Sequence, residues 1–93
     1  IRIVFRSANE IASKTSAESF AKFLQSYNQK NNFEILGPSE CALKKIALNY
    51  RYQILLRGDS LNILQKTVSM VMCNYKPAAN VYIEIDIDPV SLL

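Results

Sequence analysis

Apolar and polar residues alternate along three stretches of the chain, residues 1–6, 46–57 and 81–88. A period of two is typical of a half-buried β-strand, because successive side chains point to opposite faces of a sheet. A shorter apolar stretch, residues 33–36, predicts another strand, which the turn-forming pair Gly37-Pro38 is expected to end. The strand positions expected to face the core are Ile1, Ile3, Phe5, Ile46, Leu48, Tyr50, Tyr52, Ile54, Leu56, Val81, Ile83, Ile85 and Ile87.

Two helices are predicted between these strands. The segment Thr15-Ser-Ala-Glu18 has the form of a capping box and predicts a first helix that begins near Thr15 and ends before the polar residues 28–32. Asp59 or Ser60 is the expected N-cap of a second helix, which ends near Tyr75 because Pro77 cannot continue it. The apolar stripes at helical spacing are Phe20, Phe23, Leu24 and Tyr27 in the first helix and Leu61, Leu64, Val68, Val71 and Met72 in the second.

The element order β-α-β-β-α-β is the split βαβ pattern of ferredoxin-like domains, so the expected fold class is α+β. Right-handed crossovers then predict a four-stranded antiparallel sheet with strand order 4-1-3-2 and both helices on one face. Because this fold carries many unrelated functions, the function must be inferred from the surfaces.

The composition limits the chemistry of the chain. Its 93 residues fit one domain, residues 1–93. The chain contains no histidine, which excludes Ser-His-Asp and Cys-His nucleophiles and imidazole metal ligands. Cys41 and Cys73 have no CxxC partner, which excludes a structural zinc site and favours two free thiols in a reducing cytosol over a disulfide. Since no signal peptide or membrane-spanning run is found, we expect a cytoplasmic binding or assembly domain. Because Ile1 already lies in a predicted strand, we expect the domain to have been excised from a longer polypeptide.

Positive charge is concentrated in one segment. Residues 41–58 contain four basic residues and no acidic residue, while the whole chain has a net charge of +3. Clustered lysine and arginine residues are typical of phosphate-backbone binding, although a solvated strand face explains the same charges without a ligand. The candidate nucleic-acid contacts are Lys44, Lys45, Arg51 and Arg57.

The expected strand order separates these residues from the other arginines. The first and last strands should be neighbours, and opposite charges across a strand pair stabilise a sheet. On the face away from the helices, this pairing brings together Arg2, Arg6, Glu84 and Asp86. We therefore expect the arginines of the first strand to be partly neutralised. Arg51 and Arg57 on the third strand have no evident acidic neighbour, which makes them the better candidates for ligand contact.

Two further patterns are interpreted as structural. Tyr50 and Tyr52 invite comparison with the base-stacking aromatics of RNA-recognition modules, but they share a face with the predicted core, and the RNP1 pattern is missing. Glu84, Asp86 and Asp88 are candidate oxygen ligands for a magnesium or calcium ion. Alternate strand residues lie about 7 Å apart, however, which is too far to chelate one ion. We therefore expect no metal site and no catalytic residue in this chain.

Three stretches in the second part of the chain occur in a characteristic order. Leu36-Gly37-Pro38 precedes the basic segment, residues 49–57 read NYRYQILLR, and residues 85–93 read IDIDPVSLL. Together they resemble the C-terminal domain of the PriA family, the bacterial primosomal replication-restart helicases also called primosomal protein N'. The first helix matches only in position and character. Tyr52 departs from the family, in which an indole is common here, and its hydroxyl would need a partner if the ring is buried.

The resemblance implies a parent helicase with two ATP-driven lobes, a zinc-binding insertion and an N-terminal DNA-binding domain, so that ATP, Mg and Zn belong to the parent. This chain has no GxxxxGK[ST] motif and is expected to hold no cofactor and to hydrolyse no ATP. The resemblance further implies a domain that packs on the helicase core and helps to bind forked or single-stranded DNA. It also implies that the domain lies close to the docking site of the acidic tail of single-stranded DNA-binding protein. That protein and other primosome proteins are therefore expected partners.

Three hypotheses follow. In the first, Lys44, Lys45, Arg51 and Arg57 give the parent helicase non-specific phosphate contacts to forked or single-stranded DNA. In the second, the same bases dock an acidic partner, such as the tail of single-stranded DNA-binding protein, with little DNA affinity in isolation. The third, a ferredoxin-like small-molecule sensor or acyl-phosphate hydrolase, is disfavoured because such proteins need glycine-rich loops and this chain has only two glycines.

Overall fold

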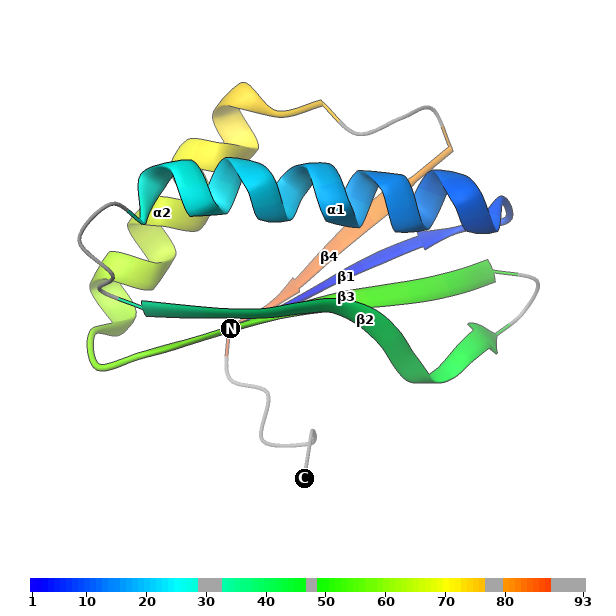
Figure 1. The fold of residues 1–93 in the computed structure, drawn as a ribbon, viewed down its shortest axis with the longest axis horizontal. Coiled ribbons are helices and arrows are strands. Elements are labelled where there is room, and N and C mark those ends of the chain that lie inside the picture. Colours follow the sequence, from blue (N-terminus) through cyan, green and yellow to red (C-terminus); the bar gives the residue numbers. More distant parts are fainter. Residues whose placement is uncertain (29–32, 47–48, 77–79, 88–93) are drawn as a thin grey trace.

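The computed structural model describes residues 1–28, 33–46, 49–76 and 80–87, without the side chains of residues 42–46. The elements follow one another in the predicted order (Figure 1). They are β1 (Arg2–Ser7), α1 (Glu10–Tyr27), β2 (Phe33–Ile46), β3 (Asn49–Gly58), α2 (Leu61–Asn74) and β4 (Tyr82–Asp86). The strands form one antiparallel sheet in the order β2-β3-β1-β4, which is the predicted order 4-1-3-2 read from the opposite edge. The prediction of an α+β, ferredoxin-like fold is therefore confirmed.

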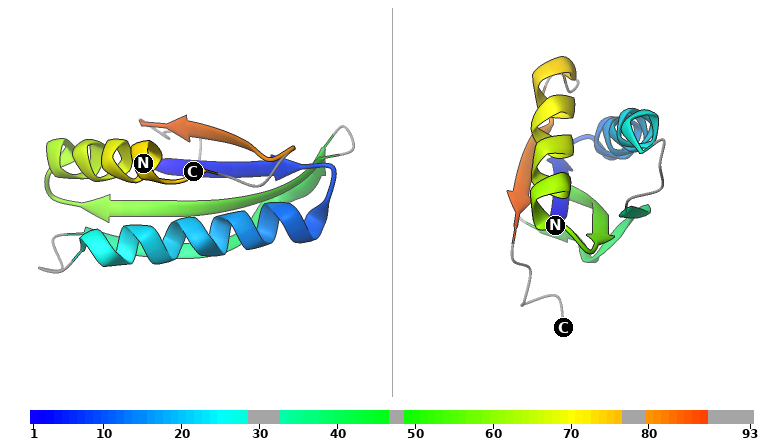
Figure 2. Two further views of the ribbon diagram at one scale, coloured as in Figure 1. Left: turned by 90° about the horizontal axis from the view of Figure 1, so that it is seen from above. Right: turned by 90° about the vertical axis from the view of Figure 1, so that its left-hand side faces the viewer.

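Both helices cover the same face of the sheet, with α1 lying along the strands and α2 beside it (Figure 2). The rings of Phe5 and Phe20 meet edge to face with their centroids 5.3 Å apart, and Phe20 makes a similar contact with Tyr75. These contacts join β1, α1 and the end of α2 in one core. The buried core residues are Ile1, Ile3, Phe5, Ala17, Phe20, Leu24, Phe33, Tyr52, Ile54, Leu56, Leu64, Val68, Val71 and Val81.

Helix α1 begins at Glu10, so the prediction of a start near Thr15 is wrong. Asn9 is the N-cap, and its side-chain oxygen accepts a hydrogen bond from the backbone N–H of Ala12 at 3.1 Å. This contact satisfies one of the free N–H groups of the first turn, and Glu10 adds a negative charge where the helix dipole favours it. The capping-box spacing at Thr15 therefore occurs inside the helix and does not mark its start.

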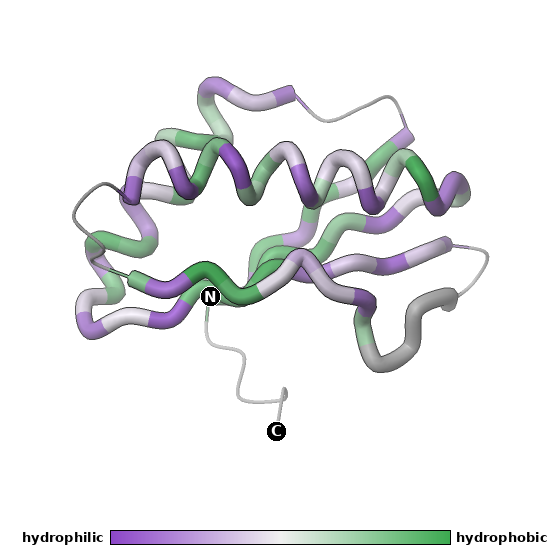
Figure 3. The backbone as a smooth tube through the Cα atoms, in the orientation of Figure 1, coloured by the Kyte–Doolittle hydropathy of each residue, from purple (hydrophilic) through white to green (hydrophobic). Residues whose placement is uncertain are grey.

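The buried face of α1 also differs from the predicted stripe. Phe20 and Leu24 are buried as expected, but Phe23 and Tyr27 are exposed. The buried positions of the N-terminal half are small residues, Ser13, Ser16 and Ala17. Small side chains let the helix backbone approach the sheet closely, and a search for large apolar residues overlooks them. In Figure 3, hydrophobic and hydrophilic segments alternate along the whole of α1.

Strand β2 continues through Gly37-Pro38, so the prediction that this pair ends the strand is wrong. Because β2 is an edge strand, the missing N–H of Pro38 can face away from the ladder, and the pairing with β3 shifts register between Leu36 and Ser39. The prediction that the third strand begins at Ile46 is wrong too, because Ile46 belongs to β2 and pairs with Asn49 of β3. The alternating pattern continues across the chain reversal and cannot mark it.

The second helix and the last strand follow the prediction in part. Ser60 caps α2 by accepting a hydrogen bond from the backbone N–H of Ile63 at 3.3 Å. The buried residues of α2 are Leu64, Thr67, Val68 and Val71, whereas Leu61 and Met72 are exposed, contrary to the predicted stripe. Ile85 and Ile87 are exposed as well, because they lie on and just after the edge strand β4, at the margin of the helix layer. No helix in the described part of the chain is long and apolar enough to cross a membrane.

Candidate nucleic-acid interface

The sheet face opposite the two helices is called the open face here. Its residues alternate along each strand with the core residues that point toward the helices. The described open-face residues of the three strands β1, β3 and β4 are Arg2, Val4, Arg6, Arg51, Gln53, Leu55, Arg57, Tyr82, Glu84 and Asp86. Four arginines and three of the chain's carboxylates, counting Glu34 on β2, are thus candidates for contacts on this face.

Arg6 is neutralised as the strand order predicts. Its Nε donates a hydrogen bond to Oε1 of Glu84 on the neighbouring strand β4. The same guanidinium group lies over the ring of Tyr82, 4.7 Å from the ring centroid. This cation–π contact and the ion pair hold Arg6 in one orientation. Both partners of the ion pair remain accessible to solvent, so the pair itself adds little stability.

Arg2 makes different contacts from those expected. It lies opposite Asp86 in the register of β1 and β4, as predicted. Its described hydrogen bonds, however, go from Nε to Oε1 of Gln53 at 2.9 Å and from Nη2 to the sulfur of Cys41 at 3.9 Å. Arg2 therefore links β1 to β3 and β2 through neutral partners, and its guanidinium is not directed away from the sheet as a free phosphate ligand would be.

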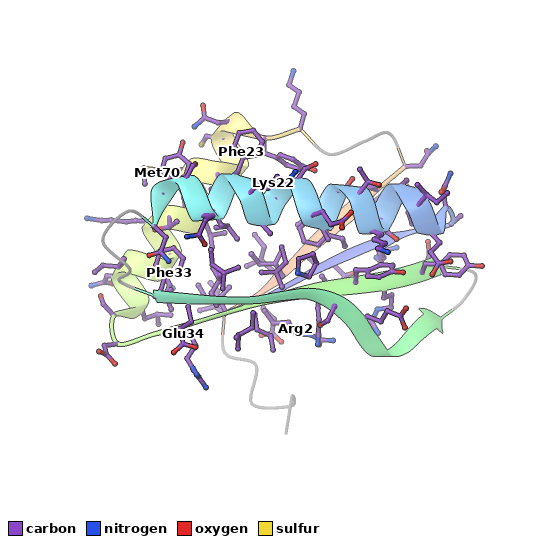
Figure 4. All side chains as sticks on the ribbon, viewed as in Figure 1. Arg2, Lys22, Phe23, Phe33, Glu34 and Met70 are labelled. Atoms are coloured by element: carbon purple, nitrogen blue, oxygen red, sulfur yellow. The ribbon has the colours of Figure 1, made fainter. Side chains whose placement is uncertain are left out.

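Arg57 has an acidic partner, so the prediction that it lacks one is wrong. Glu34 lies opposite Arg57 in the β2–β3 register, and Nη2 of Arg57 donates to Oε2 of Glu34 at 2.8 Å. Figure 4 shows Glu34 on the open face, on the opposite side of β2 from Phe33. The pairing escaped notice in the sequence because no acid is close to Arg57 along the chain. Only the antiparallel register of the edge strand brings Glu34 next to it.

Arg51 lies at the other end of β3, opposite Arg6 of β1. It is half-buried, and no hydrogen bond or ion pair is found for it within the described residues. The backbone of Lys45 pairs with Tyr50, directly beside Arg51, while the side chains of Lys44 and Lys45 lie outside the described residues. Arg57 is about 20 Å farther along β3, given about 3.3 Å per residue. The predicted site therefore divides into two separate parts.

We call the part of the sheet that carries Arg6, Arg51, Lys44 and Lys45 the basic end. Tyr82 belongs to the same end and was missed in the sequence. It lies opposite Arg6, so that Tyr82, Arg6 and Arg51 form a row across β4, β1 and β3. Its residue surface is 57% exposed. The sequence did contain a signal for it: Tyr82 alternates with the apolar residues of the last strand, so it was already expected on the face away from the core.

The two tyrosines considered in the sequence behave differently. Tyr52 is buried in the core as predicted, and its hydroxyl donates to Oε2 of Glu10 at 2.8 Å. This bond supplies the partner that a buried hydroxyl requires. Tyr50 is half-buried at the start of β3. Neither ring lies on the open face, so the conclusion that these tyrosines do not form a stacking surface is supported.

The described residues hold no cluster that suggests other chemistry. Cys41 is buried and Cys73 is exposed, and both are free thiols, as predicted. No group of three or more cysteine, aspartate or glutamate side chains is close enough to hold a metal ion within residues 1–28, 33–41, 49–76 and 80–87. Asp88, one of the acids considered for a metal, lies outside the described residues.

The opposite face of the molecule carries an apolar groove. It has a volume of about 640 Å³ and lies between α1 and the segment that follows α2. Its lining includes Ile11, Ala12, Phe23, Tyr75 and Lys76. Ile11 is 76% exposed, although it belongs to a helix that packs on the sheet. The two faces of the domain therefore differ: one is basic and carries an aromatic ring, and the other is grooved and apolar.

Comparison with known proteins agrees with the sequence motifs. The family model described as the primosomal protein N C-terminal domain matches residues 4–90. Over its full length, the chain is 42% identical to replication restart protein PriA of Borreliella burgdorferi and 36% identical to that of Treponema pallidum, and it spans 14% of each relative. It is also 39% identical over 62 residues, 67% of the chain and 10% of the relative, to replication restart protein PriA of Rickettsia felis. The chain therefore belongs to the primosomal protein N C-terminal domain family.

Proposed function

We propose that this domain binds forked or single-stranded DNA without sequence preference, through the basic end of the sheet, as part of a larger replication restart protein. The observation that carries the proposal is Arg51, which lies next to Arg6 and to the backbone of Lys45 and has no ion-pair partner among the described residues. The relatives are named replication restart proteins, a role in which contact with DNA is expected. ATP, Mg and Zn would belong to other parts of such a protein.

The proposed contacts are to phosphates. An arginine without an ion-pair partner keeps its full charge available, and its planar group can bind a phosphate with two hydrogen bonds. Phosphate contacts fix the position of a protein on DNA but carry no sequence information. Arg57 remains a predicted contact, but its pairing with Glu34 and its distance from the basic end make it the weaker candidate. The proposed contacts are therefore Arg51 and, from the sequence prediction, Lys44 and Lys45, whose side chains lie outside the described residues.

The test measures the salt dependence of binding. A fluorescein-labelled single strand is titrated with the 93-residue chain at several salt concentrations, and anisotropy is recorded. Three phosphate contacts predict a slope of about −2 for log K against log salt, since each contact to a single strand contributes about −0.7. The double variant Arg51→Ala/Lys45→Ala should bind more weakly to all sequences alike, with a slope less steep by about 1.4.

A matched variant controls for net charge. Lys22→Ala/Lys66→Ala also removes two positive charges, but from positions outside the sheet, because Lys22 is exposed on α1 and Lys66 is exposed on α2. This control should retain nearly all of the binding and most of the slope. If the two double variants bind equally well, the assignment of the site to the basic end is wrong.

A second function is supported by the apolar groove beside α1. Figure 4 shows Phe23, which lines this groove, on the outward side of the helix layer, where an apolar side chain would be costly unless covered in a complex. A protein partner, either the helicase core of the parent or an acidic tail with hydrophobic ends, fits this chemistry because Lys76 lies at the groove.

Titration of the chain with an acidic peptide and with single-stranded DNA separates the two functions. Peptide binding that Ile11→Asp abolishes, without any DNA binding, would favour docking over DNA binding.

A further inference from the structure

The exposed ring of Tyr82 distinguishes the basic end from an ordinary charged strand face. The ring lies on the open face of β4, which no described helix covers, and 57% of the residue surface is exposed. A tyrosine in such a position exposes apolar surface with no visible gain for the core. A contact with another molecule would explain it.

The surroundings of the ring fix its orientation. Arg6 covers one face of the ring at 4.7 Å from the centroid, and Glu84 in turn holds Arg6 by an ion pair. Because Arg6 occupies one ring face while more than half of the residue surface stays accessible, a ligand would approach the second ring face or the ring edge. The open face of the sheet thus presents a flat aromatic surface that is already held in place.

The neighbouring charge indicates what kind of molecule fits this surface. Arg51 lies two strands from Tyr82, at a spacing of about 10 Å, which the long side chain can largely bridge. A flat ring about 10 Å from an available arginine suits a ligand with a flat face and a negative charge a short distance from it. A nucleotide of a single strand has both, since its base is unpaired and its phosphate is close. In a duplex the base faces are already stacked on one another and unavailable.

We propose that Tyr82 stacks on a base of single-stranded DNA while Arg51 contacts an adjacent phosphate. This inference rests on the proposed DNA-binding function and adds to it a preference for unpaired bases. Stacking on an aromatic side chain is tolerant of sequence, because every base has a π-face. The preference therefore concerns the single-stranded form of DNA, whereas phosphate contacts alone would favour the duplex, which has the higher charge density.

The experiment compares three probes of equal length: oligo(dT), an abasic strand and a blunt duplex. The 93-residue chain should bind oligo(dT) about tenfold more tightly than the abasic strand, a difference of about 1.4 kcal/mol. Tyr82→Ala should remove this difference and leave binding to the abasic strand and to the duplex unchanged. Tyr82→Phe keeps the ring and should bind all three probes like the unaltered chain.

Two further measurements keep the test independent of the folding of one variant. Tyr82→Leu keeps apolar surface without a ring and should behave like Tyr82→Ala. A 2-aminopurine base within the strand should lose fluorescence on binding to the unaltered chain, because stacking quenches it, and should not do so on binding to Tyr82→Leu. Arg51→Ala, by contrast, should weaken binding to oligo(dT) and to the abasic strand by the same factor.

The outcomes separate the two proposals. If the unaltered chain binds none of the probes, the DNA-binding function is wrong and the stacking role fails with it. If it binds oligo(dT) and the abasic strand equally well, and Tyr82→Ala changes nothing, the phosphate-binding function stands and the stacking role is overturned. In that case the ring of Tyr82 serves only to hold Arg6.

Discussion

Replacing Tyr52 by phenylalanine removes a single oxygen atom from the core and tests how α1 is held on the sheet. Tyr52 is 4% exposed at the centre of β3, and its hydroxyl donates to Oε2 of Glu10 at 2.8 Å. Glu10 is the first residue of α1, so the bond joins the start of the helix to a central strand. The substitution leaves the ring, and therefore the packing of the core, in place.

The expected loss follows from the charge of the acceptor. Hydrogen bonds to charged groups contribute about 1.5 to 3 kcal/mol to stability, and the exposure of Glu10 to some solvent favours the lower value. We therefore expect Tyr52→Phe to lower the free energy of unfolding by about 1.5 kcal/mol. For a domain of this size, that loss corresponds to a melting temperature lower by about 6 to 12 °C.

Urea and thermal unfolding followed by far-UV circular dichroism measure this change. Tyr82→Phe is the matched control, because it removes the same atom from an exposed ring, and it should change stability by less than about 0.5 kcal/mol. A double-mutant cycle with Glu10→Gln should reveal a coupling of more than about 0.5 kcal/mol between the two side chains. Equal stability of the two phenylalanine variants, or strict additivity in the cycle, would refute the role assigned to this hydrogen bond.

Two other predictions concern the helix start and the irregular edge strand. Asn9→Ala should cost about 1 kcal/mol in urea unfolding, because it removes the N-cap of α1, whereas Thr15→Ala should cost nothing at an exposed helical position. A larger loss of stability for Thr15→Ala than for Asn9→Ala would instead support a helix start near Thr15. Gly37→Ala should cost about 1 to 3 kcal/mol, because Gly37 has a φ of +102° and a Cβ there would lie 2.8 Å from the carbonyl oxygen of Gln53. Unchanged stability would contradict the register of β2.

The order and pairing of the elements followed from the sequence because both depend on repeated local patterns. Alternation identified β1, the main part of β3 and β4, and the handedness of crossovers then left one strand order. Element boundaries were less predictable, since competing signals occur close together. Asn9 and Thr15 are both good caps, and only the burial of Ser13, Ser16 and Ala17 in the folded domain decides between them.

The candidate site was likewise predictable from the sequence only in part. Net charge identified the basic segment, because charge can be counted along the chain. The availability of each charge depends on a partner across the sheet: Glu34 for Arg57 and Glu84 for Arg6. These partners are distant in sequence and meet only when the strands are in register. Tyr82 was overlooked for a related reason, since its significance comes from its neighbour on β1 and not from its own segment.

The sequence alone determined the fold class, the family and the segment that carries the positive charge, because each of these depends only on local sequence pattern and composition. The tertiary structure decided which of those charges remain available and which aromatic ring lies beside them. It left Arg51 at one end of the sheet in one row with Arg6 and Tyr82, and it paired Arg57 with Glu34 at the other. The physical reason is that ion pairing acts over a few ångströms in space, and antiparallel register sets those distances independently of separation along the chain.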